Sequence, residues 1–258
     1  MDELAVGTGW ALTLLPTSAR VAGMLLLAPV FGHAAVPVRL RIFIALVIGV
    51  AVAGGVAQPH AAPAGWAELA LVIGVEVLIG AAIGYAVSLV FAGVQLGAAH
   101  VGAQMGISLG ELYGASGDGS AGPVSSLFRL VALVTFLAIG GHRQLLAALL
   151  DTFDVVPVGG AVSAGGLLPA VVSLLGVSFV LALKVAAPVL VALLLAAVAM
   201  ALLQRTLPQC HILSTGLPVR AMLGLGVMAL SLAGVAWAVE AAWALTGQSI
   251  TEMLKALG

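Results

Sequence analysis

Charge is scarce in this sequence, and so are cysteine and aromatic residues. Only 7% of the 258 residues are charged and 5% are aromatic, whereas soluble domains are about one quarter charged. The single cysteine, Cys210, excludes an internal disulfide and a cysteine-rich metal site. The formal net charge of -1 provides no basic surface of the kind that binds nucleic acid. We therefore expect neither a soluble globular domain nor a nucleic-acid partner.

Apolar residues dominate instead. They make up 62% of the chain, and the mean hydropathy is +1.25. Asp2 and Glu3 stand where a cleavable signal peptide needs basic residues, so we expect the N-terminus to be retained. The composition predicts an all-α, polytopic protein embedded in membrane lipid, with about six long, kinked apolar helices arranged in hairpins.

The apolar segments are separated by glycine, proline and polar residues. They cover residues 6–31, 40–57, 67–96, 124–140, 167–203 and 219–245, with a short amphipathic segment at 144–153. The third and fifth segments exceed the ~20 residues that cross a hydrocarbon core. Pro188 lies near the centre of the fifth, which predicts either one long kinked helix or two short helices broken at the proline.

Basic residues between these segments predict an orientation. Arg39 and Arg41 lie in the first loop, and Arg205 and Arg220 bound the fifth. By the positive-inside rule, loops one, three and five face the cytoplasm and both termini lie outside.

A few charges interrupt the apolar segments. They are Arg20, Glu76, Arg129, Lys184 and Glu240. A charge at the bilayer centre costs at least ~2.5 kcal/mol, so such a side chain should face protein or water. We predict that these five are buried or lie at subunit interfaces, and for Arg20 we favour a buried interhelical ion pair over a transport role.

Glycines recur at helical spacing in the third segment. Gly80 and Gly84, then Gly93 and Gly97, form small-xxx-small patterns that let two helix backbones approach closely. Beyond them, residues 104–123 are glycine-rich and too polar for lipid. We predict a loop that lines or plugs a lumen, the alternative being an exposed connector. The predicted plug residues are Gln104, Met105, Gly106, Ser108, Gly110, Glu111, Gly114, Gly117 and Gly119.

Three chemical functions are weaker alternatives. A G-x-S-G string at residues 114–117 is typical of intramembrane serine proteases, but its candidate bases, His142 and His211, lie at segment boundaries. A secondary transporter could use Arg20, Glu76, Lys184 or Glu240 as ion carriers, but no inverted repeat is visible. The five histidines are scattered, so no metal site or cofactor is predicted.

Four stretches of the sequence resemble one family. They are Arg20 with LAPVFG and the VPVRLRI turn (36–42), QMGIS at 104–108, FLAIGGHRQLLAALLDTFDVVPVG at 136–159, and LLQRTLPQCHILSTGLPVRAMLGL at 202–225. Together they resemble the FliR family of flagellar biosynthetic proteins, the T-type export-gate subunits of type III secretion systems. The sequence departs from the family at Leu207, where alanine is common, and at Cys210 and His211.

The resemblance implies a non-enzymatic role in the bacterial inner membrane, at the flagellar basal body. Such proteins join P-type and Q-type export-gate subunits (FliP and FliQ) in a helical, pore-forming hetero-oligomer, with the B-type switch protein (FlhB) against it, and unfolded export substrates pass through. The injectisome T-type paralogue is the close alternative, and a proton-coupled transporter is the alternative from another class.

The resemblance also implies a domain division and two site assignments. Residues 1–166 correspond to P-type-like hairpins containing the plug loop at 104–123. Residues 167–258 correspond to a Q-type-like hairpin with a cytoplasmic connector at 205–220. The connector residues are Arg205, Pro208, Gln209, Pro218 and Arg220. Apolar hairpins of this family lie partly above the bilayer, so helices are expected with more certainty than complete spans.

Overall fold

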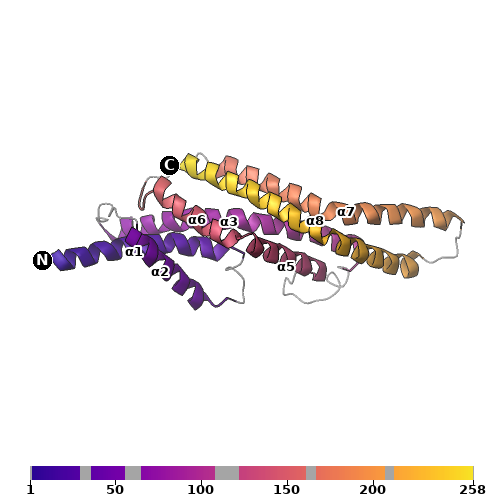
Figure 1. Ribbon diagram of the computed structural model, residues 1–258, viewed down its shortest axis with the longest axis horizontal. Coiled ribbons are helices and arrows are strands. Elements are labelled where there is room, and N and C mark those ends of the chain that lie inside the picture. The colour runs from indigo at the N-terminus through magenta and orange to yellow at the C-terminus, as the bar shows by residue number, and fades with distance from the viewer. Residues whose placement is uncertain are drawn as a thin grey trace. The chain divides into compact units, whose positions relative to one another are not determined.

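The computed structural model describes residues 2–29, 36–55, 65–107, 122–160, 167–206 and 212–257. These residues form helices and no strand (Figure 1), which confirms the predicted all-α class. The helices are α1 (Asp2–Leu27), α2 (Val38–Gly55), α3 (Trp66–Met105), α5 (Pro123–Ala138), α6 (Gly141–Val155), α7 (Leu167–Thr206) and α8 (Ile212–Leu257).

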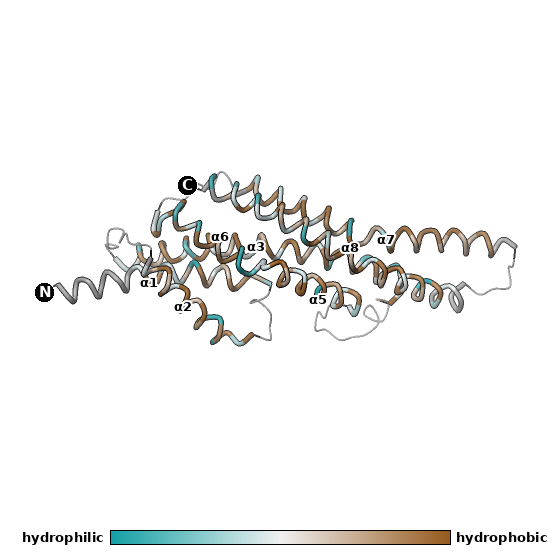
Figure 2. The backbone as a smooth tube through the Cα atoms, viewed as in Figure 1, coloured by the Kyte–Doolittle hydropathy of each residue, from teal (hydrophilic) through white to brown (hydrophobic). Residues whose placement is uncertain are grey.

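Three of the helices are much longer than a membrane is thick. α3 and α7 have 40 residues each and α8 has 46, so each is about 60–70 Å long at 1.5 Å per residue. All three are apolar enough to cross a bilayer, and Figure 2 shows apolar residues along most of their length. Because the hydrocarbon core is only ~30 Å thick, part of each helix must tilt, bend or extend beyond it.

The described residues contain fewer candidate spans than the predicted six segments. Besides the three long helices, α5 and α6 together pass the same test as a pair bent by 65°. α1 contributes a shorter apolar stretch, Thr13–Leu27. Three or four spans still fit a polytopic membrane protein.

Several predicted boundaries need correction. The third segment does not end at residue 96, because α3 continues without a break to Met105. Pro188 lies inside α7 and Pro218 inside α8. Of the two alternatives for the fifth segment, the single long helix is therefore correct.

The bend between α5 and α6 has a local cause. Gly140 adopts a left-handed conformation, with φ of +71°, which costs other L-residues ~1–2 kcal/mol. The backbone N–H groups of Arg143 and Gln144 then bond to its carbonyl as α6 begins. α6 contains the predicted amphipathic segment and buries Leu145, Leu149 and Phe153.

The helices pack as two compact units that do not follow chain order. The first unit comprises Met1–Leu89, Gly140–Leu174 and Thr246–Gly258, and the second comprises Val90–Ile139 and Leu175–Leu245. Each of α3, α7 and α8 therefore contributes to both units. The division at residues 166 and 167, which the resemblance implies, stays a prediction.

The glycine pattern on α3 marks close helix contacts in both units. In the first unit, a Cβ on Gly84 would lie 2.5 Å from the carbonyl oxygen of Met24 on α1. In the second, Cβ atoms on Gly93 and Gly97 would lie 2.5 Å from the carbonyl oxygens of Ser178 and Ala182 on α7. These separations leave no room for a side chain, so the predicted small-residue packing is confirmed.

Candidate functional site

The deepest polar feature of the first unit is an ion pair between α1 and α3. Arg20 is 0% exposed and Glu76 is 1% exposed. Nε of Arg20 donates to Oε2 of Glu76 at 2.5 Å. The ion pair predicted for Arg20 is therefore confirmed, and its partner is another predicted charge, 56 residues away.

The other guanidinium nitrogens of Arg20 reach α6 and the turn that follows it. Nη1 donates to Oγ1 of Thr152 at 3.0 Å, and Nη2 donates to the carbonyl oxygen of Val156 at 2.9 Å. The guanidinium carbon also lies 4.2 Å from the centroid of the Phe153 ring, which adds a cation–π contact. One arginine thus connects three elements that are more than 50 residues apart in the chain.

Glu76 is held from two sides. Its Oε2 accepts from Arg20, and its Oε1 accepts the backbone N–H of Gly159 at 3.1 Å. Gly159 has φ of +73°, a conformation that glycine adopts without strain. Both oxygens have a donor, so the carboxylate is satisfied without water or a bound ion.

The remaining predicted buried charges are not buried within this chain. Lys184 on α7 and Glu240 on α8 are exposed, and Arg129 on α5 is half-buried. For these three residues, the predicted alternative of a subunit interface stays a prediction. Nζ of Lys184 lies 6.0 Å from the ring centroid of Trp237, and Trp237 is itself 65% exposed.

The first two residues of the predicted plug loop lie in a helix and not in a loop. Gln104 and Met105 lie in the last helical turn of α3, and Met105 is buried. The helix ends at Met105. Gly106 follows it with φ of +76°, and Pro123 already belongs to α5. The other predicted plug residues lie outside the described residues: Ser108, Gly110, Glu111, Gly114, Gly117 and Gly119.

The predicted connector is likewise largely helical. Arg205 lies at the end of α7, whereas Pro218 and Arg220 lie inside α8. Pro208 and Gln209 lie outside the described residues. Residues 205–206 and 212–220 of the predicted connector are therefore helical, and residues 207–211 lie outside the described residues.

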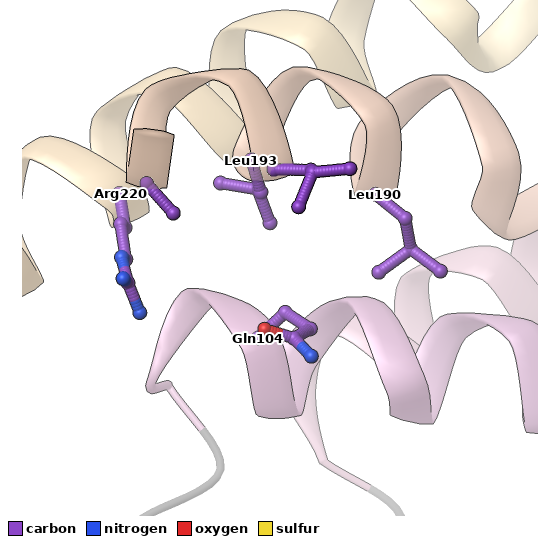
Figure 3. A pocket seen from close by; sticks show the side chains of 6 residues that line it. Gln104, Leu190, Leu193 and Arg220 are labelled. Atoms are coloured by element: carbon purple, nitrogen blue, oxygen red, sulfur yellow. The ribbon is translucent and has the colours of Figure 1, made fainter. Parts of the chain in front are cut away.

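Two of these corrected residues line a common cavity in the second unit (Figure 3). The cavity has a volume of about 280 Å³ and lies between the end of α3 and the helices α7 and α8. Gln104 and Arg220 supply its polar groups, and its apolar lining is Leu190, Leu193, Leu194 and Ala197. Sequence reasoning placed Gln104 and Arg220 in separate features and missed the cavity.

Of the five histidines, only His100 and His142 lie in the described ranges. No three His, Cys, Asp or Glu residues in the described ranges lie close enough together to hold a metal ion. Nδ1 of His100 lies 2.9 Å from the carbonyl oxygen of Leu96, and Nδ1 of His142 has no hydrogen-bond partner within the described residues. His33, His60, His211 and the G-x-S-G string lie outside the described residues.

Comparison with known proteins identifies the family. Residues 11–245 match the family described as bacterial export proteins, family 1. The chain is 28% identical to the flagellar biosynthetic protein FliR of Escherichia coli, over 81% of this chain and 80% of that protein. It is 29% identical to FliR of Caulobacter vibrioides, over 84% and 87%, and 22% identical to FliR of Bacillus subtilis, over 93% of each. The match covers most of both packing units, and the chain therefore belongs to the FliR family of flagellar membrane export proteins.

Proposed function

We propose that the chain acts in the flagellar type III export gate as its T-type subunit, joining P-type and Q-type subunits (FliP and FliQ) and the B-type switch protein (FlhB). Together they form the channel that passes unfolded substrates across the inner membrane. Family membership already gives a non-enzymatic role in flagellar export. The partners and the channel are the proposal, and they follow from the family resemblance and from the surface of α7 and α8.

Charges on the apolar surface of α7 and α8 support a protein partner. Lys184 lies near the middle of the candidate span Leu168–Leu203, and Glu240 lies within Pro218–Met253. Both are exposed in the chain alone, and only 22% of the apolar window in α7 is buried. A charge facing lipid at this depth costs at least ~2.5 kcal/mol. Apolar helices of other subunits that bring opposite charges to Lys184 and Glu240 would remove that cost.

The test replaces each of these charges with leucine and measures assembly. In Lys184→Leu and Glu240→Leu, we expect the chain to fold but to co-purify at least tenfold less of the P-type and Q-type subunits, because interfacial ion pairs are lost. Glu252→Leu is the matched control, since Glu252 is exposed on the same helix α8 near its end. Wild-type amounts of both partners with Lys184→Leu and Glu240→Leu would overturn the proposed interface.

The glycine-rich segment that follows α3 supplies the closing element in this proposal. Glycine has no side chain, so a segment rich in it could be displaced at low steric cost when a polypeptide arrives. The assignment rests on the composition of residues 106–122 and on the family resemblance. α3 carries this segment directly, because its last helical residue is Met105.

The alternatives receive less support. Arg20 and Glu76 satisfy each other inside the first unit, which removes two of the four ion carriers that a proton-coupled transporter would use. The relatives named above are flagellar rather than injectisome proteins. Loss of swimming motility on gene deletion, restored by the plasmid-borne gene, would distinguish the flagellar role from the injectisome role.

A further inference from the structure

The cavity at the end of α3 contains polar groups that the fold itself does not use. Figure 3 shows the guanidinium of Arg220 on α8 and the amide of Gln104 on α3, with Leu190 and Leu193 of α7 on the opposite wall. Neither polar side chain makes a hydrogen bond or ion pair within the part of the chain that the structure describes. Arg220 is half-buried, so its charge has lost part of its contact with water without gaining a partner. An anionic ligand would compensate it.

The cavity lies toward the end of the second unit at which α7 is followed by α8. α3 ends at Met105, one residue after Gln104. α7 continues past Ala197 to Thr206, and α8 begins at Ile212, eight residues before Arg220. By the positive-inside rule, Arg205 and Arg220 favour the cytoplasmic side for this end of the helices, and the proposal uses that orientation.

The lining of the cavity has two chemical parts. Arg220 presents a planar fork of N–H donors that matches the oxygens of a phosphate, and the Gln104 amide can donate one further hydrogen bond. Leu193 is 4% exposed, whereas Leu194 is 63% exposed and faces the surroundings. The volume of about 280 Å³ is smaller than the pockets of ~300–1,000 Å³ that enclose whole drug-sized ligands. The chemistry fits a charged headgroup whose apolar remainder continues outside the cavity.

We propose that this cavity binds the phosphate of an anionic phospholipid, with Arg220 pairing the phosphate oxygens, Gln104 donating to them, and the leucines covering the glycerol and the first methylene groups. Basic pockets between membrane helices on the cytoplasmic side bind anionic headgroups in this way. The proposal rests on the membrane placement in the proposed function but not on the plug or on any partner subunit.

The test is native mass spectrometry of the full-length chain, purified with its co-expressed partners in mild detergent and titrated with phosphatidylglycerol or phosphatidylcholine. We expect one phosphatidylglycerol per chain, bound at least tenfold more tightly than phosphatidylcholine. Arg220→Gln should abolish this preference. Arg220→Lys should weaken it severalfold, because a point charge replaces the bidentate fork.

Two further variants separate binding from folding. Ala197→Leu fills the cavity while keeping Arg220, so it should also reduce phosphatidylglycerol binding tenfold. Arg129→Gln removes a half-buried arginine of the same unit that does not line the cavity, and it should bind like the wild type.

The contrary outcomes are distinct. Equal phosphatidylglycerol binding by the wild type, Arg220→Gln and Ala197→Leu would overturn the site. Displacement of the lipid by millimolar inorganic phosphate would show a site for the free anion and not for a lipid. An exported polypeptide cross-linked at Ala197 in place of lipid would also overturn the proposal. Loss of the P-type and Q-type subunits from a sample that still binds the lipid would count against the proposed function and not against this site.

Discussion

At the scale of single residues, the Arg20 network shows why a charge can be retained deep in an apolar chain. Removing two charges from water is costly, and their attraction offsets that cost only if the remaining donors and acceptors are satisfied. Thr152, Val156 and Gly159 provide these partners. Each partner comes from residues 141–160, so the network fixes α6 and its following turn against α1 and α3.

We predict that removing one charge of this pair is much worse than removing both. Arg20→Met should destabilise the first unit by about 3–5 kcal/mol, because Glu76 is left buried without its cation. The double variant Arg20→Met/Glu76→Met should recover most of this loss. Denaturant unfolding of the purified chain in detergent measures both effects.

Lys184→Met is the control for this prediction, since Lys184 is exposed in the chain. The free energy of unfolding of this variant, measured on the isolated chain, should match that of the wild type within about 0.5 kcal/mol. The account of the network is wrong if Arg20→Met is no less stable than the double variant.

The sequence indicates which residues enter such a network but not how they pair. Arg20 and Glu76 can be picked out from the sequence because they lie deep within apolar segments, where a charge that faces lipid is costly. The same argument could not tell burial within the chain from a subunit interface for Lys184 and Glu240, because both leave the same sequence pattern. The carbonyl of Val156 and the N–H of Gly159 could not be found at all, since backbone groups carry no residue-type signal.

At the scale of helices, glycines on α3 let the backbone of α1 approach closely. A Cβ on Gly80 would overlap the backbone carbonyl of Arg20 and lie 3.0 Å from the backbone nitrogen of Met24. Gly74, on the same helix, has no atom within 4 Å of such a Cβ. Both glycines therefore lie inside the same helix, but only at Gly80 would an added Cβ meet a neighbouring helix.

This difference gives a matched pair of substitutions. Gly80→Ala should destabilise the chain by about 1–3 kcal/mol, because α1 must move away from α3. Gly74→Ala should be neutral or stabilising by up to about 1 kcal/mol, because alanine favours the helix. The measurement is the thermal unfolding of the two variants. Equal changes in the stability of Gly80→Ala and Gly74→Ala would show that the α1–α3 contact is looser than described.

Helix existence was predictable, whereas helix ends were not. Long apolar segments and glycine spacing suffice to predict α3, α7 and α8. The glycine-rich composition of residues 104–123 suggests a loop, but α3 continues to Met105. The Met105 side chain is buried against α8, within 3 Å of where a Cβ on Gly224 would lie. The same tertiary contact could not be read from local composition, and it also explains why Gln104 faces the cavity.

At the scale of the whole molecule, the proposed plug can be tested through the permeability of the membrane. Deleting residues 110–119 should leave assembly with the partner subunits intact but let small solutes leak into the cell, because the closing segment is gone. Growth in the presence of a normally excluded dye, with dye uptake measured, reports the leak. An intact barrier at normal expression of the deletion variant would contradict the plug.

The surface of the chain as a whole indicates that it does not work alone. Much of α7 and α8 is exposed and apolar, and it includes Lys184 and Glu240 in the middle of candidate spans. Lipid can cover the apolar part but not the charges at low cost. The chain by itself therefore has an incomplete surface, in agreement with a subunit of a larger export gate.

The most direct measurement is mild detergent purification of the tagged chain from its native cell, with mass spectrometry of the proteins that accompany it. The account predicts one large particle containing the P-type and Q-type export subunits, and its disruption by Lys184→Leu or Glu240→Leu. A chain that runs alone or as a small homo-oligomer, while those subunits are present in the same cells, would contradict it.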